Sequence, residues 1–346
     1  MRTKSALFTL ALVGGAALLA ACSGNGASGT QSSVPGGGST MQTQAHGSML
    51  WRTGIDPAVF SKIHARHAKH VPARPRRFKE LAVSDAGLNE VVQFNRTFGN
   101  MGSFSNSYGD GIWIDPAGNI YVADYASLAV DEYDQTGTLL YTYNSGLTDP
   151  VDVTTDSSGN VYVANYGSAG SANVVEYPPM TNTPTASCNT NLANEGLIVD
   201  KTGDLFVTGN NSGGTGNIYE FAPGGLASCS WTTLTPTLTF AGGITIDNTG
   251  ALVVCDQLAG IDIIPPPYTS ISKTITVPGG SDYFHDALTG RNTKNPNGTW
   301  EYLFIADAGT AEVYVLNYTN DSLVTTLNSS NGLSLPYGVA TYKFKP

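Results

Sequence analysis

Four acidic residues and one histidine lie at or near the start of successive apolar runs along the chain. They are Asp110, Asp152, Glu195, His285 and Asp286. Carboxylates gathered round one opening would suit a hard divalent cation, Ca²⁺ or Mg²⁺, which is the one cofactor that the sequence suggests. Two neighbouring carboxyls could also act as a general acid and a general base, because the repulsion between their charges raises the pKa of one of them. The same residues would occur as loop caps and turn formers in an acidic protein, and the sequence favours that interpretation.

The elements that must position these residues are short strands in a repeat. Residues 111–140 contain three or four apolar stretches separated by turns such as Asp115-Pro116-Ala117-Gly118, a composition that suits tight hairpins. The turn aspartates Asp115, Asp156, Asp200 and Asp247 are 41, 44 and 47 residues apart. A period of roughly 40–50 residues with four strands in each unit is typical of a β-propeller. The innermost strands of such a fold line a central channel, so the acidic set would surround its mouth.

The two ends of the chain supply complementary parts of one unit. Residues 81–85 and 90–94 match the second and third strands of the repeat, and Tyr337–Tyr342 matches the missing first strand. The sequence therefore predicts an all-β, six-bladed β-propeller of four-stranded antiparallel blades over residues 80–346. One C-terminal strand would join three N-terminal strands, leaving no open sheet edge at the seam.

The recurring string G-I-x-I-D-x-x-G-N-I-Y-V-A-D resembles the NHL-repeat branch of six-bladed β-propellers, and the resemblance covers 267 residues. Its motif residues build hairpins, so it implies a fold and says little of activity. We expect a binding or scaffold module for a protein or polysaccharide, acting as a monomer. The alternative is a metal-dependent hydrolase or lyase like the gluconolactonase and regucalcin propellers, which hold a metal at the channel mouth. No residue-by-residue match to their metal motif is visible here.

Residues 1–22 have the features of a secretory signal peptide, with Arg2 and Lys4 ahead of an uncharged apolar run. The ending Leu19-Ala20-Ala21-Cys22 resembles a bacterial lipoprotein box. This resemblance implies that Cys22 is lipidated and that the exported protein is anchored to a membrane of the cell envelope. Ser23 after the cysteine implies the outer membrane if the organism is Gram-negative.

Two segments of different composition separate the leader from the repeats. Residues 23–50 are rich in Gly, Ser and Thr and predict a flexible linker. Residues 51–79 are basic, with a short helix expected from Asp56 to His70. Residues 1–79 hold ten Lys or Arg and one acid, which leaves 17 − 10 = 7 bases and 27 − 1 = 26 acids for the rest. The basic segment could dock on the acidic propeller or on anionic envelope polymers or lipids, whereas nucleic acid is an unsuitable partner for so acidic a propeller.

Three cysteines remain after Cys22. Cys255 takes a position that small residues fill in other repeats, so we expect a buried, inert thiol. Cys188 and Cys229 both follow Ala-Ser, in neighbouring repeats. Equivalent points on neighbouring blades usually lie too far apart to bridge, but irregular loops could bring them together, and the sequence leaves this disulfide open.

Overall fold

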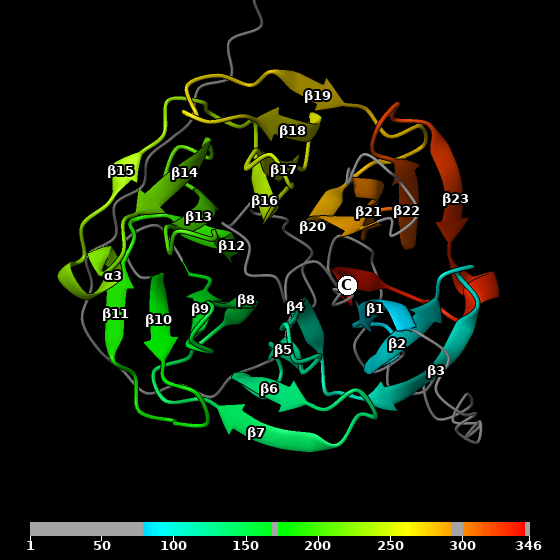
Figure 1. Ribbon diagram of the computed structural model, residues 1–346, viewed down its shortest axis with the longest axis horizontal. Coiled ribbons are helices and arrows are strands. Elements are labelled where there is room, and N and C mark those ends of the chain that lie inside the picture. The colour runs from blue at the N-terminus through cyan, green and yellow to red at the C-terminus, as the bar shows by residue number, and fades with distance from the viewer. Residues whose placement is uncertain (1–78, 168–171, 292–299, 343–346) are drawn as a thin grey trace, which may run out of the picture. The chain divides into compact units, whose positions relative to one another are not determined.

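The computed structural model describes residues 79–167, 172–291 and 300–342. Six four-stranded sheets stand round a central axis as the blades of a propeller (Figure 1). All strand pairs within the blades are antiparallel, as the pairing of β4 with β5 and of β5 with β6 illustrates. The predicted all-β six-bladed propeller is therefore confirmed.

The strands follow the chain blade by blade, except at the seam. The seam blade consists of β24 (Pro336–Thr341), β1 (Lys79–Asp85), β2 (Glu90–Asn95) and β3 (Asn100–Ser105). The next two blades consist of β4 (Gly109–Ile114), β5 (Ile120–Asp124), β6 (Ala129–Tyr133) and β7 (Leu139–Tyr143), then β8 (Pro150–Thr155), β9 (Val161–Asn165), β10 (Asn173–Tyr177) and β11 (Ala186–Asn189).

The remaining three blades complete the ring. They consist of β12 (Ala193–Val199), β13 (Leu205–Asn210), β14 (Gly216–Phe221) and β15 (Thr232–Thr233); β16 (Ala241–Ile246), β17 (Leu252–Asp256), β18 (Gly260–Ile264) and β19 (Lys273–Ile275); and β20 (Tyr283–Arg291), β21 (Trp300–Asp307), β22 (Glu312–Asn317) and β23 (Leu323–Leu327). A one-turn helix α3 (Gly225–Ser228) precedes β15, and a 3₁₀ turn η2 (Ser329–Asn331) precedes β24.

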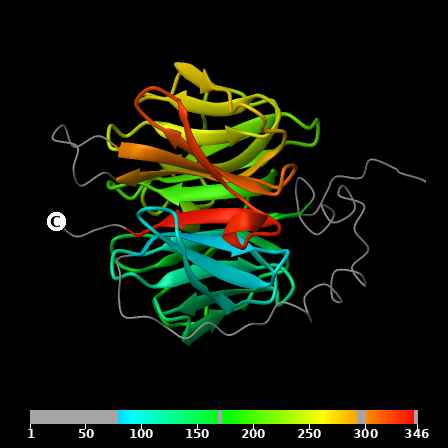
Figure 2. The ribbon, with the colours of Figure 1, turned by 90° about the vertical axis from the view of Figure 1, so that its right-hand side faces the viewer.

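The seam closes as the sequence predicts. β24 pairs with β1 in an antiparallel register that sets Leu81 opposite Thr341 and Val83 opposite Val339, and Figure 2 shows the red C-terminal strand beside the first cyan strand. We call the face where the innermost strands begin the entry face, and the opposite one the exit face. Because β1 ends at Asp85 opposite Pro336, Asp85 lies at the entry face. The chain therefore enters the propeller at Lys79 and leaves β24 at Thr341, both on the exit face.

The first hairpin of each typical blade turns at the exit face on an aspartate and a glycine. Asp115 Oδ1 accepts the backbone N–H groups of Gly118 and Asn119 at 2.7 and 2.8 Å. Gly118 has φ 93°, a left-handed conformation that favours glycine. Asp156 makes the same turn, accepting from Ser158 and Asn160. The repeated D-x-x-G string is thus a turn-forming signal.

The core consists of apolar side chains packed between neighbouring blades. One cluster joins Val83 and Val92 of the seam blade to Ile112 and Val122 of the blade β4–β7. Another joins Val174 and Leu197 across the boundary between the third and fourth blades. Each such side chain stabilises the fold by about 1.5–3 kcal/mol when fully buried, so every blade depends on both of its neighbours.

Several predictions concern residues before 79. The leader 1–22, the lipidation site Cys22, the linker 23–50 and the basic segment up to residue 78 all lie outside the described residues and stay predictions. Among the residues that are described, no helix has the length and apolar character needed to cross a membrane.

Candidate functional site

The innermost strands carry the predicted mouth residues to the entry end of the channel. Asp110 lies in β4, Asp152 in β8 and Glu195 in β12, and all three are buried. These strands contact one another in order round the axis. His285 and Asp286 belong to β20, where His285 pairs with Ala306, but their side chains lie outside the described part of the chain.

Asp152 holds two neighbouring inner strands together. Its Oδ2 accepts the backbone N–H of Leu197 on β12 at 2.9 Å, and its Oδ1 accepts the N–H of Val153 at 2.8 Å. On the other side it packs against Gly111 of β4, where a Cβ atom would collide with the carboxylate. Both oxygens of Asp152 thus accept hydrogen bonds from backbone N–H groups. This arrangement suits a residue that stabilises the fold better than it suits a metal ligand.

The Glu195 carboxylate accepts a hydrogen bond from a side chain of its own blade. Asn210 Nδ2, at the end of β13, donates to Glu195 Oε1 at 3.2 Å. Across the described residues, no group of three or more His, Cys, Asp or Glu side chains is placed to hold a metal ion. The predicted site for Ca²⁺ or Mg²⁺ would therefore need His285 and Asp286, and it stays a prediction.

A small cavity lies between five of the six inner strands. It has a volume of about 10 Å³, which is close to the space that a single water molecule needs. Ile112, Val153, Leu197, Ile244 and Val339 line it from five of the inner strands, together with the polar residues Asp152 and Thr245. This cavity is too small for a substrate of ordinary size. The side chains of the sixth inner strand, β20, lie outside the described residues.

One polar residue at the end of the second strand anchors the entry-face loop in five blades. We call these five, Asp85, Asp124, Asn165, Asp256 and Asp307, the loop-anchoring residues. Asp124 Oδ2 accepts the N–H of Ser107 at 2.9 Å and the N–H of Tyr108 at 3.3 Å. Asn165 Oδ1 binds two successive N–H groups in the same way, as do the carboxylates of the other three. Sequence reasoning missed this role, although the recurrence of Asp or Asn after each second strand was a usable signal.

One of the loop-anchoring residues, Asp85, has a carboxyl with a raised pKa. Asp85 is fully buried, and burial raises its pKa to about 6 in spite of the backbone N–H groups that it accepts. Its partners are Ser334, Leu335 and Leu88. Since Ser334 and Leu335 precede β24, this carboxyl connects the two ends of the propeller chain.

The blade β12–β15 departs from the common scheme. Its Asn210 accepts the N–H of Ala241 in the next blade, at 2.8 Å, instead of anchoring its own loop. Thr190 Oγ1 donates to Asn194 Oδ1 at 2.6 Å in that loop. This blade also contains α3, which contacts β11 of its neighbour.

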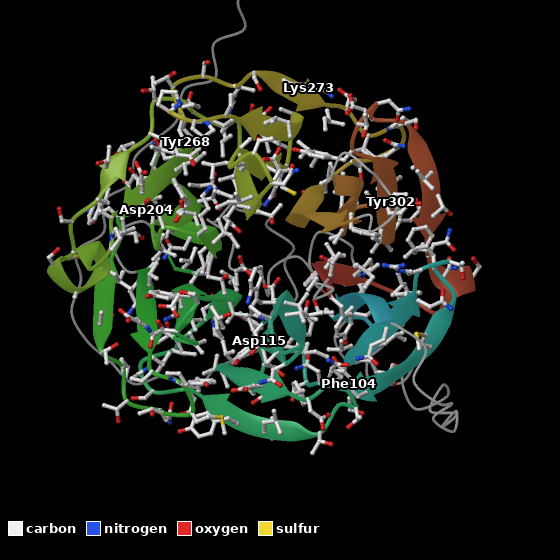
Figure 3. The ribbon with its side chains drawn as sticks, viewed as in Figure 1. Phe104, Asp115, Asp204, Tyr268, Lys273 and Tyr302 are labelled. Atoms are coloured by element: carbon white, nitrogen blue, oxygen red, sulfur yellow. A yellow bond between two sulfur atoms is a disulfide. The ribbon has the colours of Figure 1, made fainter. Side chains whose placement is uncertain are left out.

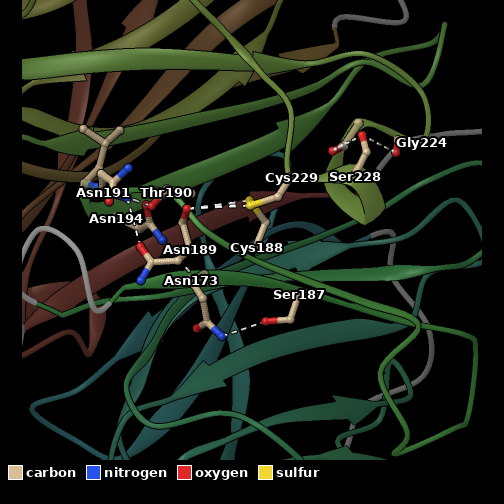
Figure 4. Close-up of a disulfide and its surroundings, with 12 residues drawn as sticks. Asn173, Ser187, Cys188, Asn189, Thr190, Asn191, Asn194, Gly224, Ser228 and Cys229 are labelled. Atoms are coloured by element: carbon tan, nitrogen blue, oxygen red, sulfur yellow. Dashed lines mark hydrogen bonds between the residues drawn. A yellow bond between two sulfur atoms is a disulfide. The ribbon is translucent and has the colours of Figure 1, made fainter.

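A disulfide joins Cys188 of β11 to Cys229 at the end of α3 (Figure 4). Their Cα atoms are 5.1 Å apart. The sequence left this pair open because regular blades would separate them. The inserted turn α3, with Leu226 buried beneath it, brings Cys229 across the boundary between blades. Cys255 is buried, as expected, and is not part of a disulfide.

The entry face also presents aromatic and apolar side chains. Tyr108 Oη donates to Tyr337 Oη at 3.2 Å, and the Tyr108 ring lies 5.9 Å from the rings of both Tyr125 and Tyr337. Burial raises the pKa of Tyr108 and of Tyr337, so both hydroxyls stay protonated. Tyr125 is partly exposed at the edge of this cluster.

Two leucines on the entry-face turns are exposed. Leu128 is 45% exposed and Leu258 is 66% exposed. Leu128 also has φ 54°, a conformation that costs a non-glycine residue roughly 1–2 kcal/mol. The corresponding turn position of the seam blade holds Asn89, with the same φ. A leucine here is unfavourable for both conformation and solvation, which points to a role outside the stability of the fold.

No family model matches the chain, and no curated protein matches it. Among solved structures, a protein of unknown function from Bacteroides caccae is similar with TM-score 0.58 and 14% identity, over 77% of this chain and 99% of that one. A chain of the nidogen/laminin complex is similar with TM-score 0.60 and 14% identity, over 77% and 98%. A streptogramin B lyase aligns over 64% of this chain and 68% of its own, at 14% identity and TM-score 0.42. The first two likenesses establish the propeller fold; the third is too distant to support an argument.

Proposed function

We propose that the protein is an NHL-like propeller, anchored to the cell envelope through Cys22, that binds a protein ligand on its entry face. The observation that carries this proposal is the exposure of two leucines on entry-face turns, Leu128 at 45% and Leu258 at 66%. The cavity between the described inner strands, at about 10 Å³, is far smaller than small-molecule sites, which normally enclose several hundred Å³.

The entry face suits such a surface because its loops are held by buried hydrogen bonds. The loop-anchoring residues bind successive backbone N–H groups in five blades. Ordered loops lose little conformational entropy when a ligand binds. Exposed Leu128 and Leu258, with partly exposed Tyr125 beside the tyrosine cluster, supply the apolar and aromatic contacts that protein interfaces use.

The lactonase-like hydrolase or lyase is less well supported. It requires mouth carboxylates that are available to a metal or a substrate, and Asp152 accepts backbone N–H groups with both oxygens. The similar propeller in the nidogen/laminin complex is in keeping with protein binding by this fold.

The test is capture from an envelope extract by the wild-type protein and by a Leu128→Asn/Leu258→Ser variant. We expect a protease-sensitive ligand that the wild type retains and the variant loses. Leu139→Ser/Leu140→Ser on β7 is the matched control, because it also removes two exposed leucines but from an outer strand. A retained ligand that resists protease and yields to glycosidase would favour a polysaccharide and contradict the proposal, as would equal retention by all three proteins.

A further inference from the structure

The connection between the third and fourth strands of each blade reaches back onto the preceding blade, and we call these connections the interblade latches. In the seam blade, the Phe98 ring lies 5.5 Å from the Tyr302 ring of the blade β20–β23. In the blade β16–β19, the Tyr268 ring lies 5.2 Å from the Phe206 ring of the blade before it. Figure 3 shows Tyr268 and Tyr302 on different blades of the ring.

Three more interblade latches use hydrogen bonds to the preceding blade. The donor and acceptor residues are Gln93 with Gln135, Met180 with Tyr143, and Tyr318 with Asp247, at 3.3, 3.0 and 3.1 Å. Across the described residues, five of the six blades are therefore latched by contacts that need no covalent bond.

The sixth interblade latch, in the blade β12–β15, is the disulfide between Cys188 and Cys229. Here the connection contains α3, which contacts β11 of the preceding blade and buries one side chain, Leu226. A helix of one turn is not stable by itself. The attachment of α3 to the preceding blade therefore depends on Leu226 and on the disulfide.

The two sulfur atoms of this disulfide differ in their access to solvent. Cys229 is exposed, whereas Cys188 is buried, so a thiolate from solvent attacks Cys229 Sγ. The attack forms a mixed disulfide on Cys229, breaks the bond between the two cysteines and leaves the electron pair on Cys188 Sγ. The second thiol of a dithiol then attacks its own sulfur in the mixed disulfide, which releases Cys229 and oxidises the dithiol to a cyclic disulfide. The two protons that the dithiol gives up convert both cysteines to thiols.

The breakage of this bond is coupled to movement of α3. The apolar neighbours of Cys188 include Leu226 and Phe221, and a thiolate among such side chains is poorly solvated. Water reaches Cys188 Sγ when α3 leaves β11. Reduction and release of α3 should therefore occur together.

We propose that the disulfide between Cys188 and Cys229 is a redox-sensitive latch. Reduction by a dithiol, the group that protein thiol–disulfide oxidoreductases carry, frees residues 222–231 from β11 while the propeller stays closed. The strand pairing at the seam does not involve these cysteines, and neither do the other five interblade latches. The entry-face residues of the proposed function are also not involved, so this latch is independent of the ligand proposed above.

The test is reduction of the folded full chain by dithiothreitol, followed by alkylation, peptide mass mapping and chymotrypsin digestion. We expect alkylation of Cys188 and Cys229. Chymotrypsin should cleave after Leu226 and Trp231 at least about tenfold faster than in the oxidised protein, because proteolysis follows the population of the open form. Cleavage after Tyr268, in a latch without a disulfide, is the internal reference and should not change. Reoxidation should restore the slow rate.

Two variants complete the test. Cys188→Ser/Cys229→Ser should be cleaved quickly with or without dithiothreitol. The matched control is Cys255→Ala, which removes a buried cysteine outside the disulfide and should respond to dithiothreitol as the wild type does. Thermal unfolding of the oxidised and reduced wild type shows whether the ring stays folded, and the wild type alone decides the test if the double variant misfolds.

Three results would overturn the proposal. The first is a disulfide that resists dithiothreitol in the folded protein. The second is an unchanged rate of cleavage within residues 222–231 after reduction. The third is unfolding of the whole propeller on reduction, which would make the disulfide a structural crosslink.

Discussion

The two faces of the propeller use the same residue type for different purposes. On the entry face, Asp85, Asp124 and Asp152 are buried and accept backbone N–H groups from loops or neighbouring strands. On the exit face, Asp115, Asp156 and Asp200 are partly exposed turn formers whose side chains accept N–H groups of their own turns. An acidic residue near a channel mouth is therefore weak evidence for chemistry until its hydrogen-bond donors are known.

The largest contrast between the faces should appear in stability. Asp124→Ala should lower the free energy of unfolding by about 3 kcal/mol, because it leaves the buried N–H of Tyr108 and the part-buried N–H of Ser107 without an acceptor. Asp115→Ala removes a turn aspartate on the exit face and should cost about 1 kcal/mol, since water can solvate the freed donors. Urea unfolding measures both. Equal losses would mean that the faces do not differ in this way.

The pH dependence of stability should have opposite signs on the two faces. The pKa of Asp85 is raised to about 6 by burial, so the native state binds its proton more tightly than the unfolded state does. Its contribution is therefore fully present below the unfolded pKa and is lost as the pH rises to about 6, by up to about 3 kcal/mol. Asp134, in an exit-face turn, has its pKa lowered first by the Thr136 hydroxyl, so its contribution is present above the unfolded pKa and is lost as the pH falls.

Two substitutions isolate the contribution of Asp85 to the pH dependence of stability. Asp85→Asn should flatten the unfolding free energy between about pH 4 and pH 6, and the fold should tolerate it, because Asn165 anchors the corresponding loop of another blade. Asp134→Asn should leave that decline unchanged and remove only the loss at lower pH. A decline that persists in Asp85→Asn would show that another group is responsible.

A smaller effect separates the two exposed leucines of the entry face. Leu128→Asn should stabilise the protein by about 1 kcal/mol, because asparagine tolerates a positive φ better than leucine does. Leu258→Asn is the control, since Leu258 is not among the positive-φ residues, and it should change stability little. Thermal unfolding of both variants checks this. No gain for Leu128→Asn would remove the conformational argument for a binding role at that turn.

The fold was largely predictable from the sequence because turns and strands are local signals. The D-x-x-G string marked the hairpins, and residues 337–342 matched the strand missing from the first unit. The site was less predictable, because spacing placed Asp152 on an inner strand but not next to the N–H of Leu197. The disulfide depended on α3, a four-residue helix without periodicity that begins after Gly224. The contact of Asp152 with Leu197 and the disulfide both join residues distant in the sequence, and local sequence signals do not encode such contacts.

A calcium titration of thermal unfolding, on the wild type and on Asp152→Ala, tests most directly whether the entry-face carboxylates belong to the scaffold. We expect millimolar calcium to leave the wild-type Tm within about 1 °C of its starting value. Asp152→Ala should lower the Tm by several degrees with or without calcium, because it leaves the buried N–H of Leu197 without an acceptor. A rise of several degrees in the wild type that Asp152→Ala abolishes would contradict the account and favour a metal-dependent site at the channel mouth.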